Sequence, residues 1–256
     1  MRVNINMHGL EKAKQELVAR FSDRRLRAAM ATAATRTVRE LAKGWQQQMQ
    51  QAFDRPTPAT LRSVRTTMAT SASLQAEVAV KDVASVGGTA PVEWLRPEET
   101  GGARGLKKFE AALQAQGSMP HGWRAVPGPA AKLDGYGNVS RSQIVQVIAQ
   151  LGAKFSPGYQ RVISASAARR AARAVALGRA YVAIVPGSRG TKLRPGVYER
   201  KRRALVPVFF YVPAVRYSKR IRLEHEARVR AGPILSRELT RAIEESAARL
   251  AARGAR

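Results

Sequence analysis

The sequence contains no cysteine, which excludes disulfide bonds, zinc–thiolate sites and thiol catalysis. Aromatic residues make up only 6% of the 256 residues, so a core must consist mainly of Val, Leu, Ile and Ala. No stretch reaches the ~18 uninterrupted apolar residues of a membrane span. The longest apolar run, 204–215, contains Pro207 and Pro213, and no apolar signal core follows the first residues. We therefore expect a soluble protein that is made in a cytoplasm and contacts no membrane.

Residue types that carry catalysis or bind metals are also scarce. The three histidines are far apart in the sequence: His8, His121 and His225. His225 begins a possible metalloprotease helix motif, but position 229 is Val where that motif needs His. The few aspartates form no carboxylate cluster of the kind that a metal-dependent nuclease needs. The glycine-rich stretches 101–105 and 187–192 lack the spacing of a dinucleotide or phosphate loop. We predict no catalytic, metal-binding or cofactor-binding residues and no cofactor.

Acidic residues are few beside the basic ones. The chain has 45 Lys and Arg against 18 Asp and Glu, a net charge of +27. Solubility needs only a few net charges, so this excess indicates a polyanion or acidic neighbours. The basic clusters are spread over the whole chain without interleaved aromatics, which favours nonspecific attraction to phosphates. Seven residues are our candidates for polyanion or partner contact: Arg169, Arg170, Arg173, Arg200, Lys201, Arg202 and Arg203.

Apolar periodicity predicts the elements of the N-terminal part. Residues 2–6 alternate as a short strand, and helical spacing follows over 10–21. A long helix of ~45 Å is expected from Ser22 or Asp23 to Asp54. Its apolar stripe consists of Leu26, Met30, Ala33, Thr37, Leu41, Trp45, Met49 and Phe53. A hairpin is expected over 61–81, and Val92 with Trp94 suggests a further short strand.

The patterns in the rest of the sequence predict an insertion, followed by segments that complete the first domain. Helices are expected near Phe109 and over 140–151, within a loop-rich region. Strands are expected over 180–185, at 197–198 and over 205–212, with Pro207 at an edge or a bulge. A final helix from about residue 220 contains Gly232 and Pro233, which should kink or interrupt it. We predict an α+β fold: an antiparallel sheet packed against long N- and C-terminal helices, with a mixed insertion. The predicted divisions are 1–97, 98–178 as the insertion, and 179–256 completing the first domain.

Four stretches together resemble the phage minor tail proteins of the Z type, also called tail-completion or neck proteins. They are residues 53–58 after the long helix, 94–110, 134–138 before a helix, and 195–200 before a strand and the C-terminal helix. The resemblance implies a non-enzymatic virion protein that completes the tail or joins it to the head. It implies a ring of identical copies, usually sixfold, with neighbouring neck and tail proteins as partners and genomic DNA contacted nonspecifically.

Two other classes of function stay open at this point. A free nonspecific nucleic-acid-binding protein would share the basic composition and would bind as a small oligomer with a steep salt dependence. A phage-encoded nuclease or lytic enzyme would lose its activity on a single acidic-to-alanine change. A glycosidase carboxylate pair is compatible with the sequence, although no pattern indicates one.

Overall fold

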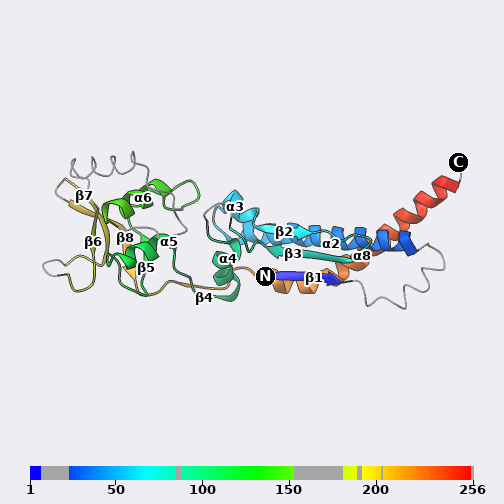
Figure 1. The fold of residues 1–256 in the computed structure, drawn as a ribbon, viewed down its shortest axis with the longest axis horizontal. Coiled ribbons are helices and arrows are strands. Elements are labelled where there is room, and N and C mark those ends of the chain that lie inside the picture. The colour runs from blue at the N-terminus through cyan, green and yellow to red at the C-terminus, as the bar shows by residue number, and fades with distance from the viewer. Residues whose placement is uncertain (7–22, 85–87, 153–180, 189–191, 203, 255–256) are drawn as a thin grey trace. The chain divides into compact units, whose positions relative to one another are not determined.

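The computed structural model describes residues 1–6, 23–84, 88–152, 181–188, 192–202 and 204–254 (Figure 1). The chain divides into two compact units. Unit 1 comprises Met1–Gly101 and Lys219–Arg256, and unit 2 comprises Gly102–Ser218. Antiparallel sheets and helices occur in both units, so the predicted α+β class is confirmed. None of the described helices combines the length and apolarity that crossing a membrane requires.

Unit 1 is built from one three-stranded sheet and two long helices. Its elements are β1 (Arg2–Asn6), α2 (Asp23–Ala52), α3 (Pro58–Leu61), β2 (Val64–Thr67), β3 (Gln75–Val80), α4 (Pro91–Thr100) and α8 (Leu223–Gly254). The strand order is β1-β3-β2, and both pairings are antiparallel. The predicted first strand, long helix and hairpin are thus confirmed. The helix expected over 10–21 lies outside the described residues.

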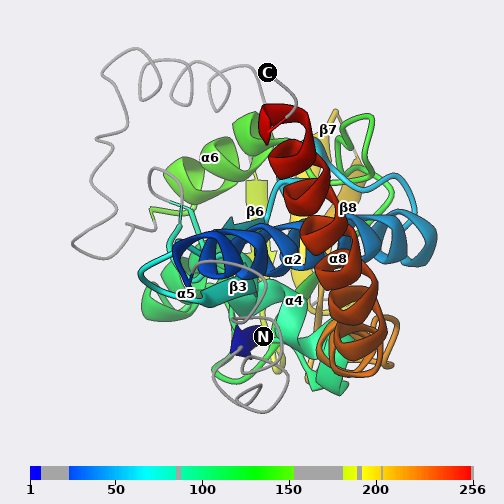
Figure 2. The same cartoon turned by 90° about the vertical axis from the view of Figure 1, so that its right-hand side faces the viewer.

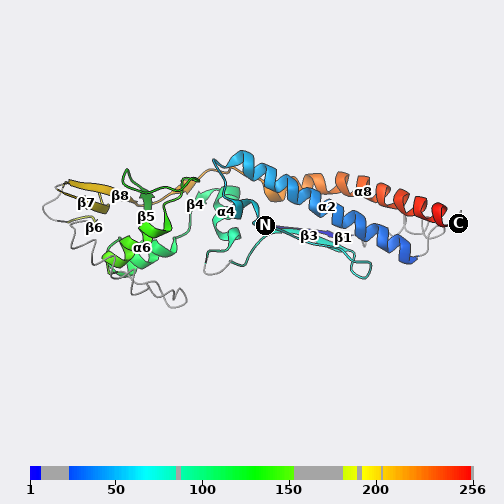
Figure 3. The ribbon, with the colours of Figure 1, turned by 90° about the horizontal axis from the view of Figure 1, so that it is seen from above.

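The apolar stripe of α2 forms the centre of the unit 1 core. Its predicted members from Leu26 to Met49 are buried, and Trp45 is 1% exposed. The stripe packs against the inward residues of the sheet, such as Ile5 and Val78. α8 packs along the same helix (Figures 2 and 3), where Ala33 and Ala242 allow a close approach. Both long helices therefore share one core with the small sheet, as the alternating and helical patterns require.

One local expectation in unit 1 was wrong, and one of the two alternatives expected at Pro233 was not found. Val92 and Trp94 lie in helix α4, not in a strand. Pro91 stands at the first helical turn, where its fixed φ is already helical, and Glu93 complements the N-terminal end of the helix dipole. In α8, Gly232 and Pro233 do not interrupt the helix, which continues to Gly254. The alternative expectation, a kink at these residues, stays a prediction.

Unit 2 contains a separate four-stranded sheet. Its elements are β4 (Gly102–Ala103), α5 (Lys108–Ala115), β5 (Arg124–Pro127), α6 (Arg141–Gln150), β6 (Tyr181–Ile184), β7 (Gly196–Lys201), β8 (Ala204–Val212) and β9 (Arg216–Tyr217). The strand order is β5-β8-β7-β6, and β4 pairs with β9. Residues of α5 and α6 pack on one face of the larger sheet, as Figure 3 shows, with Leu113 and Ile148 against Phe209.

The second domain boundary differs from the prediction. Strands β6, β7 and β8 were assigned to the first domain, but they belong to unit 2, which continues to Ser218. The physical reason is the pairing of β8 with β5, which joins residues far apart in the sequence. The first boundary is close to the predicted one, since unit 2 begins at Gly102.

Pro207 lies on an interior strand at a bulge. The register between β7 and β8 shifts between Val197 and Tyr198, opposite the residue that follows Pro207. The bulge that Pro207 indicated is confirmed, whereas an edge position is not, because β8 pairs on both sides. The carbonyl of Pro207 still accepts a hydrogen bond from the N–H of Ala130.

Candidate nucleic-acid interface

Positive charge is concentrated in unit 2. Residues 102–218 contain 20 Lys and Arg but only three Asp and Glu, so they account for +17 of the +27. Unit 1 is longer and contributes the remaining +10. The basic clusters occur in both units, as expected, but the net charge is shared unequally between the units. A polyanion would be attracted chiefly to unit 2.

The first carboxylate of unit 2, Glu110, is enclosed in an internal ion pair. It is 0% exposed and accepts hydrogen bonds from both terminal nitrogens of Arg104. It also accepts bonds from the backbone N–H groups of Ala125 and Lys107. Burial raises the pKa of Glu110, but the bonds from Arg104 and these N–H groups outweigh it and leave the pKa below its usual range. Glu110 therefore serves chiefly to neutralise the buried Arg104.

The other two carboxylates also serve local structure. Glu199 is buried on β7, where Lys201 Nζ lies 3.4 Å from its Oε2. Asp134 accepts hydrogen bonds at Oδ1 from the N–H groups of Tyr136 and Asn138, which holds its own turn together. With only three carboxylates beside 20 Lys and Arg, unit 2 has far fewer anionic than cationic side chains.

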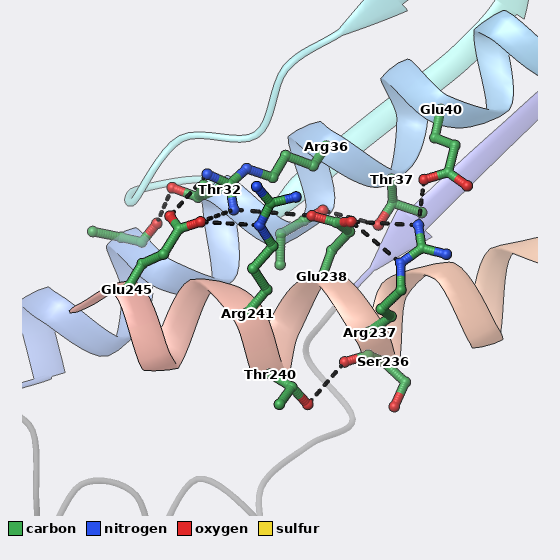
Figure 4. A network of polar contacts seen from close by, with 12 residues as sticks. Thr32, Arg36, Thr37, Glu40, Ser236, Arg237, Glu238, Thr240, Arg241 and Glu245 are labelled. Atoms are coloured by element: carbon green, nitrogen blue, oxygen red, sulfur yellow. Dashed lines mark hydrogen bonds and ion pairs between the residues drawn. The ribbon is translucent and has the colours of Figure 1, made fainter. Parts of the chain in front are cut away.

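In unit 1, by contrast with unit 2, several acidic side chains form ion pairs between the two long helices (Figure 4). Arg36 of α2 donates two hydrogen bonds, of 3.1 and 2.9 Å, to Glu245 of α8. The hydrogen bond from Arg36 lowers the pKa of Glu245. Arg237 of α8 bonds in turn to Glu40 of α2 and lies 3.3 Å from Glu238. These pairs neutralise arginines within the fold and set the register of the helices.

The hairpin of β7 and β8 carries the members of the predicted site that lie within the described residues. Arg200 pairs with Leu205 and Lys201 with Ala204, so Arg202 lies in the loop between the strands. Arg200, Lys201 and Arg202 are all exposed. The sequence places arginine at the loop where Asn, Asp or Gly would suit a tight hairpin best.

Arg202 occupies a left-handed backbone conformation, with φ at 52°. Two-residue hairpin loops of type I′ require positive φ, which glycine and asparagine adopt readily. For another L-residue this conformation costs roughly 1–2 kcal/mol. The hairpin thus presents a guanidinium at its tip at a cost in stability. Strain of this kind clusters at functional positions.

The structure brings together three of the seven predicted contact residues. Arg200, Lys201 and Arg202 are adjacent on the β7–β8 hairpin. The remaining four lie outside the described residues: Arg169, Arg170, Arg173 and Arg203. Lys192 and Arg194, which the sequence analysis did not select, are exposed in the connection between β6 and β7. In the sequence, their position between turn-forming residues and Pro195 was the sign that they would lie exposed in a loop.

The described residues of the predicted site are exposed cations. Within the described residues, no three His, Asp or Glu side chains lie close enough to hold a metal ion. The shifted pKa of Glu110 has a structural cause, its pairing with buried Arg104. Comparisons with family models, with curated proteins and with solved structures gave no match.

Proposed function

We propose that the chain is a structural virion protein of a tailed bacteriophage, a tail-completion or head–tail joining subunit that forms a ring near the DNA channel. One observation carries the proposal: unit 2 has a net charge of +17, and two of its three carboxylates, Glu110 and Glu199, are buried and paired with cations of the same unit. Such a unit requires an external polyanion or acidic neighbours for neutralisation. A packaged genome passing through a ring supplies phosphates without any need for chemistry.

Unit 1 supports the assembly role. Its two long helices, 30 and 32 residues, are held together by one apolar core and by ion pairs such as Arg36–Glu245. A closed ring needs two different patches on each subunit, joined head to tail. A long, internally braced helix pair offers such patches on a rigid element. The partners proposed are further copies of this chain, in a sixfold ring, and the adjacent neck and tail proteins.

The test is to locate the chain in particles. We expect electron microscopy of purified virions to place it in the neck or at the tail end, and a gene knockout to give filled heads and separate tails. Complementation with the wild-type gene should restore joined particles. Normal, infectious particles from the knockout would overturn the proposal.

A free nucleic-acid-binding protein is the second candidate, since the exposed cations of the β7–β8 hairpin favour it equally. The two candidates differ in where the chain is found. A free binder stays outside particles and binds DNA or RNA as a small oligomer with a steep salt dependence. A neck subunit enters particles in a fixed copy number.

A further inference from the structure

We propose that a cleft between α2 and α8 binds a phosphate group. The cleft has a volume of about 230 Å³ and lies within unit 1. The name phosphate cleft is used below for this site. Its lining residues come from both helices: Arg25, Ala28, Ala29, Thr32, Ala242, Ser246, Arg249 and Leu250. The inference does not depend on the proposed function, because it concerns unit 1 and not the basic surface of unit 2.

The lining of the phosphate cleft contains cations and no carboxylate. Arg25 of α2 and Arg249 of α8 are its two charged residues. Within the described part of the chain, Arg25 forms no ion pair. Arg249 lies 3.5 Å from one carboxylate, Glu245, which already accepts hydrogen bonds from Arg36 and Arg241. Two like charges on one cleft repel each other, whereas an anion between them attracts both.

The register of the helices shows what is missing at the cleft. Farther along the same helix pair, Arg36 of α2 lies 3.9 Å from Glu238 of α8 (Figure 4). Arg25 precedes Arg36 by 11 residues and Arg249 follows Glu238 by 11, which is close to three turns of each helix. Arg249 therefore stands where this register would place a carboxylate opposite Arg25. A bound phosphate would supply the missing negative charge.

The size of the cleft and its hydroxyl groups favour phosphate as the ligand. Small-molecule sites usually measure roughly 300–1,000 Å³, so the cleft suits a single group better than a whole cofactor. Arginine binds phosphate through two parallel hydrogen bonds. The Ser246 hydroxyl has no hydrogen bond to another described residue and can add a donor. The hydroxyl of Thr32 instead donates to the carbonyl of Ala28 at 2.8 Å. Three donors from two helices suit a group with at least three oxygens.

Hydrogen exchange of the full-length chain, followed by mass spectrometry, measures binding at the cleft separately from binding to the cations of unit 2. Inorganic phosphate is titrated at constant ionic strength, with acetate as the replacement anion. We expect phosphate to slow exchange in residues 23–33 and 242–252. Arg25→Gln and Arg249→Gln should each raise the half-maximal phosphate concentration about tenfold, because each removes hydrogen bonds between charged groups. Unchanged exchange in β3 shows that each variant is folded.

Each variant has a matched control of the same charge. Arg24→Gln removes the neighbouring exposed arginine of α2, which does not line the cleft. Arg241→Gln removes an arginine that pairs with Glu245 four residues away, as Arg249 does, but does not line the cleft either. Both controls should bind phosphate as the wild type does. Equal weakening in cleft and control variants would overturn the inference.

The phosphate can come from free phosphate or from a nucleic-acid backbone, and a short DNA duplex in the same assay separates these sources. Protection of the two segments by the duplex, at a lower concentration of phosphate groups, assigns the cleft to a nucleic-acid backbone. Protection by inorganic phosphate alone assigns it to free phosphate. Protection by neither, or equal protection by acetate, would contradict a phosphate site. Absence of the chain from virions would instead overturn the proposed function and leave this result unchanged.

Discussion

Gly196 and Phe209 approach each other so closely that a Cβ on Gly196 would lie 2.2 Å from the carbonyl oxygen of Phe209. The clash is with backbone, on neighbouring strands of the unit 2 sheet. We expect Gly196→Ala to force β7 away from β8 and to lower the stability of unit 2 by about 1–3 kcal/mol, the usual range for overpacking. Urea unfolding followed by circular dichroism measures this change.

Gly105→Ala is the matched control for that substitution. A Cβ at Gly105 meets no atom within 4 Å, and its φ is not in the left-handed region. We expect no loss of stability there. A Gly196→Ala variant as stable as Gly105→Ala would show that the strands can separate without cost.

The buried pair of Arg104 and Glu110 predicts a strong effect of removing one partner. Glu110→Gln leaves the Arg104 guanidinium buried without a countercharge, which typically costs about 3–5 kcal/mol. The double variant Arg104→Met/Glu110→Leu replaces both charges with apolar groups and should lose much less. Thermal unfolding of the three proteins at pH 7 compares them. A Glu110→Gln variant no weaker than the double variant would contradict the prediction.

The same pair predicts a pH dependence. The folded-state pKa of Glu110 is lowered, so the stabilisation it contributes is complete above its unfolded pKa, ordinarily near 4.5. That contribution is lost as the pH falls from about 4.5 through the lowered folded pKa. Stability measured from pH 6 to pH 2 should fall more steeply for the wild type than for the double apolar variant. Parallel curves would show that Glu110 does not titrate differently on folding.

Arg202 predicts opposite changes in stability and in DNA binding. Asparagine tolerates positive φ better than arginine, so Arg202→Asn should raise the stability of unit 2 by up to ~1 kcal/mol. The loss of one cation should weaken binding to duplex DNA at low salt. Arg200→Asn, on a strand with ordinary φ, should weaken binding without the gain in stability. A gain from both substitutions would point to relief of charge repulsion instead of strain.

Separate cores predict separate responses to core substitutions. Leu41 lies in the core of unit 1 and Leu113 in that of unit 2, and both are nearly unexposed. Leu→Ala in a core typically costs 2–5 kcal/mol. In hydrogen exchange, Leu41→Ala should reduce protection in α2 and β3, and Leu113→Ala in α5 and β8. Loss of protection in both units from either substitution would show that they unfold as one.

The elements that the sequence predicted best are those with long local periodicity. α2 has a stripe of apolar residues from Leu26 to Met49, and Ser140 caps α6 by accepting a hydrogen bond from the N–H of Gln143. Short elements were harder, because four residues carry little periodicity. β5 was missed in a loop-rich stretch, since its strand character comes from pairing with β8.

The charged site was only partly visible in the sequence for a similar reason. The basic run at 200–203 stands out in composition, but the place of Arg200, Lys201 and Arg202 on a hairpin follows from strand register. The concentration of charge in unit 2 could be recognised only once the boundary of the unit was known. That boundary is defined by strand pairing between residues far apart in the sequence. The pairing of Glu110 with Arg104 could be suspected from their spacing, but its burial could not.

Because unit 2 interrupts unit 1, the order of synthesis on the ribosome separates their folding. Unit 2 is complete once Ser218 has left the exit tunnel. Unit 1 must wait for Ile221, Leu223 and the rest of α8, which fill its core from the far end of the chain. During that interval the nascent α2 lacks its helical partner and part of its stripe has nothing to pack on. Translation of the last helix is therefore the step at which chaperone contact and premature self-association would compete with native folding.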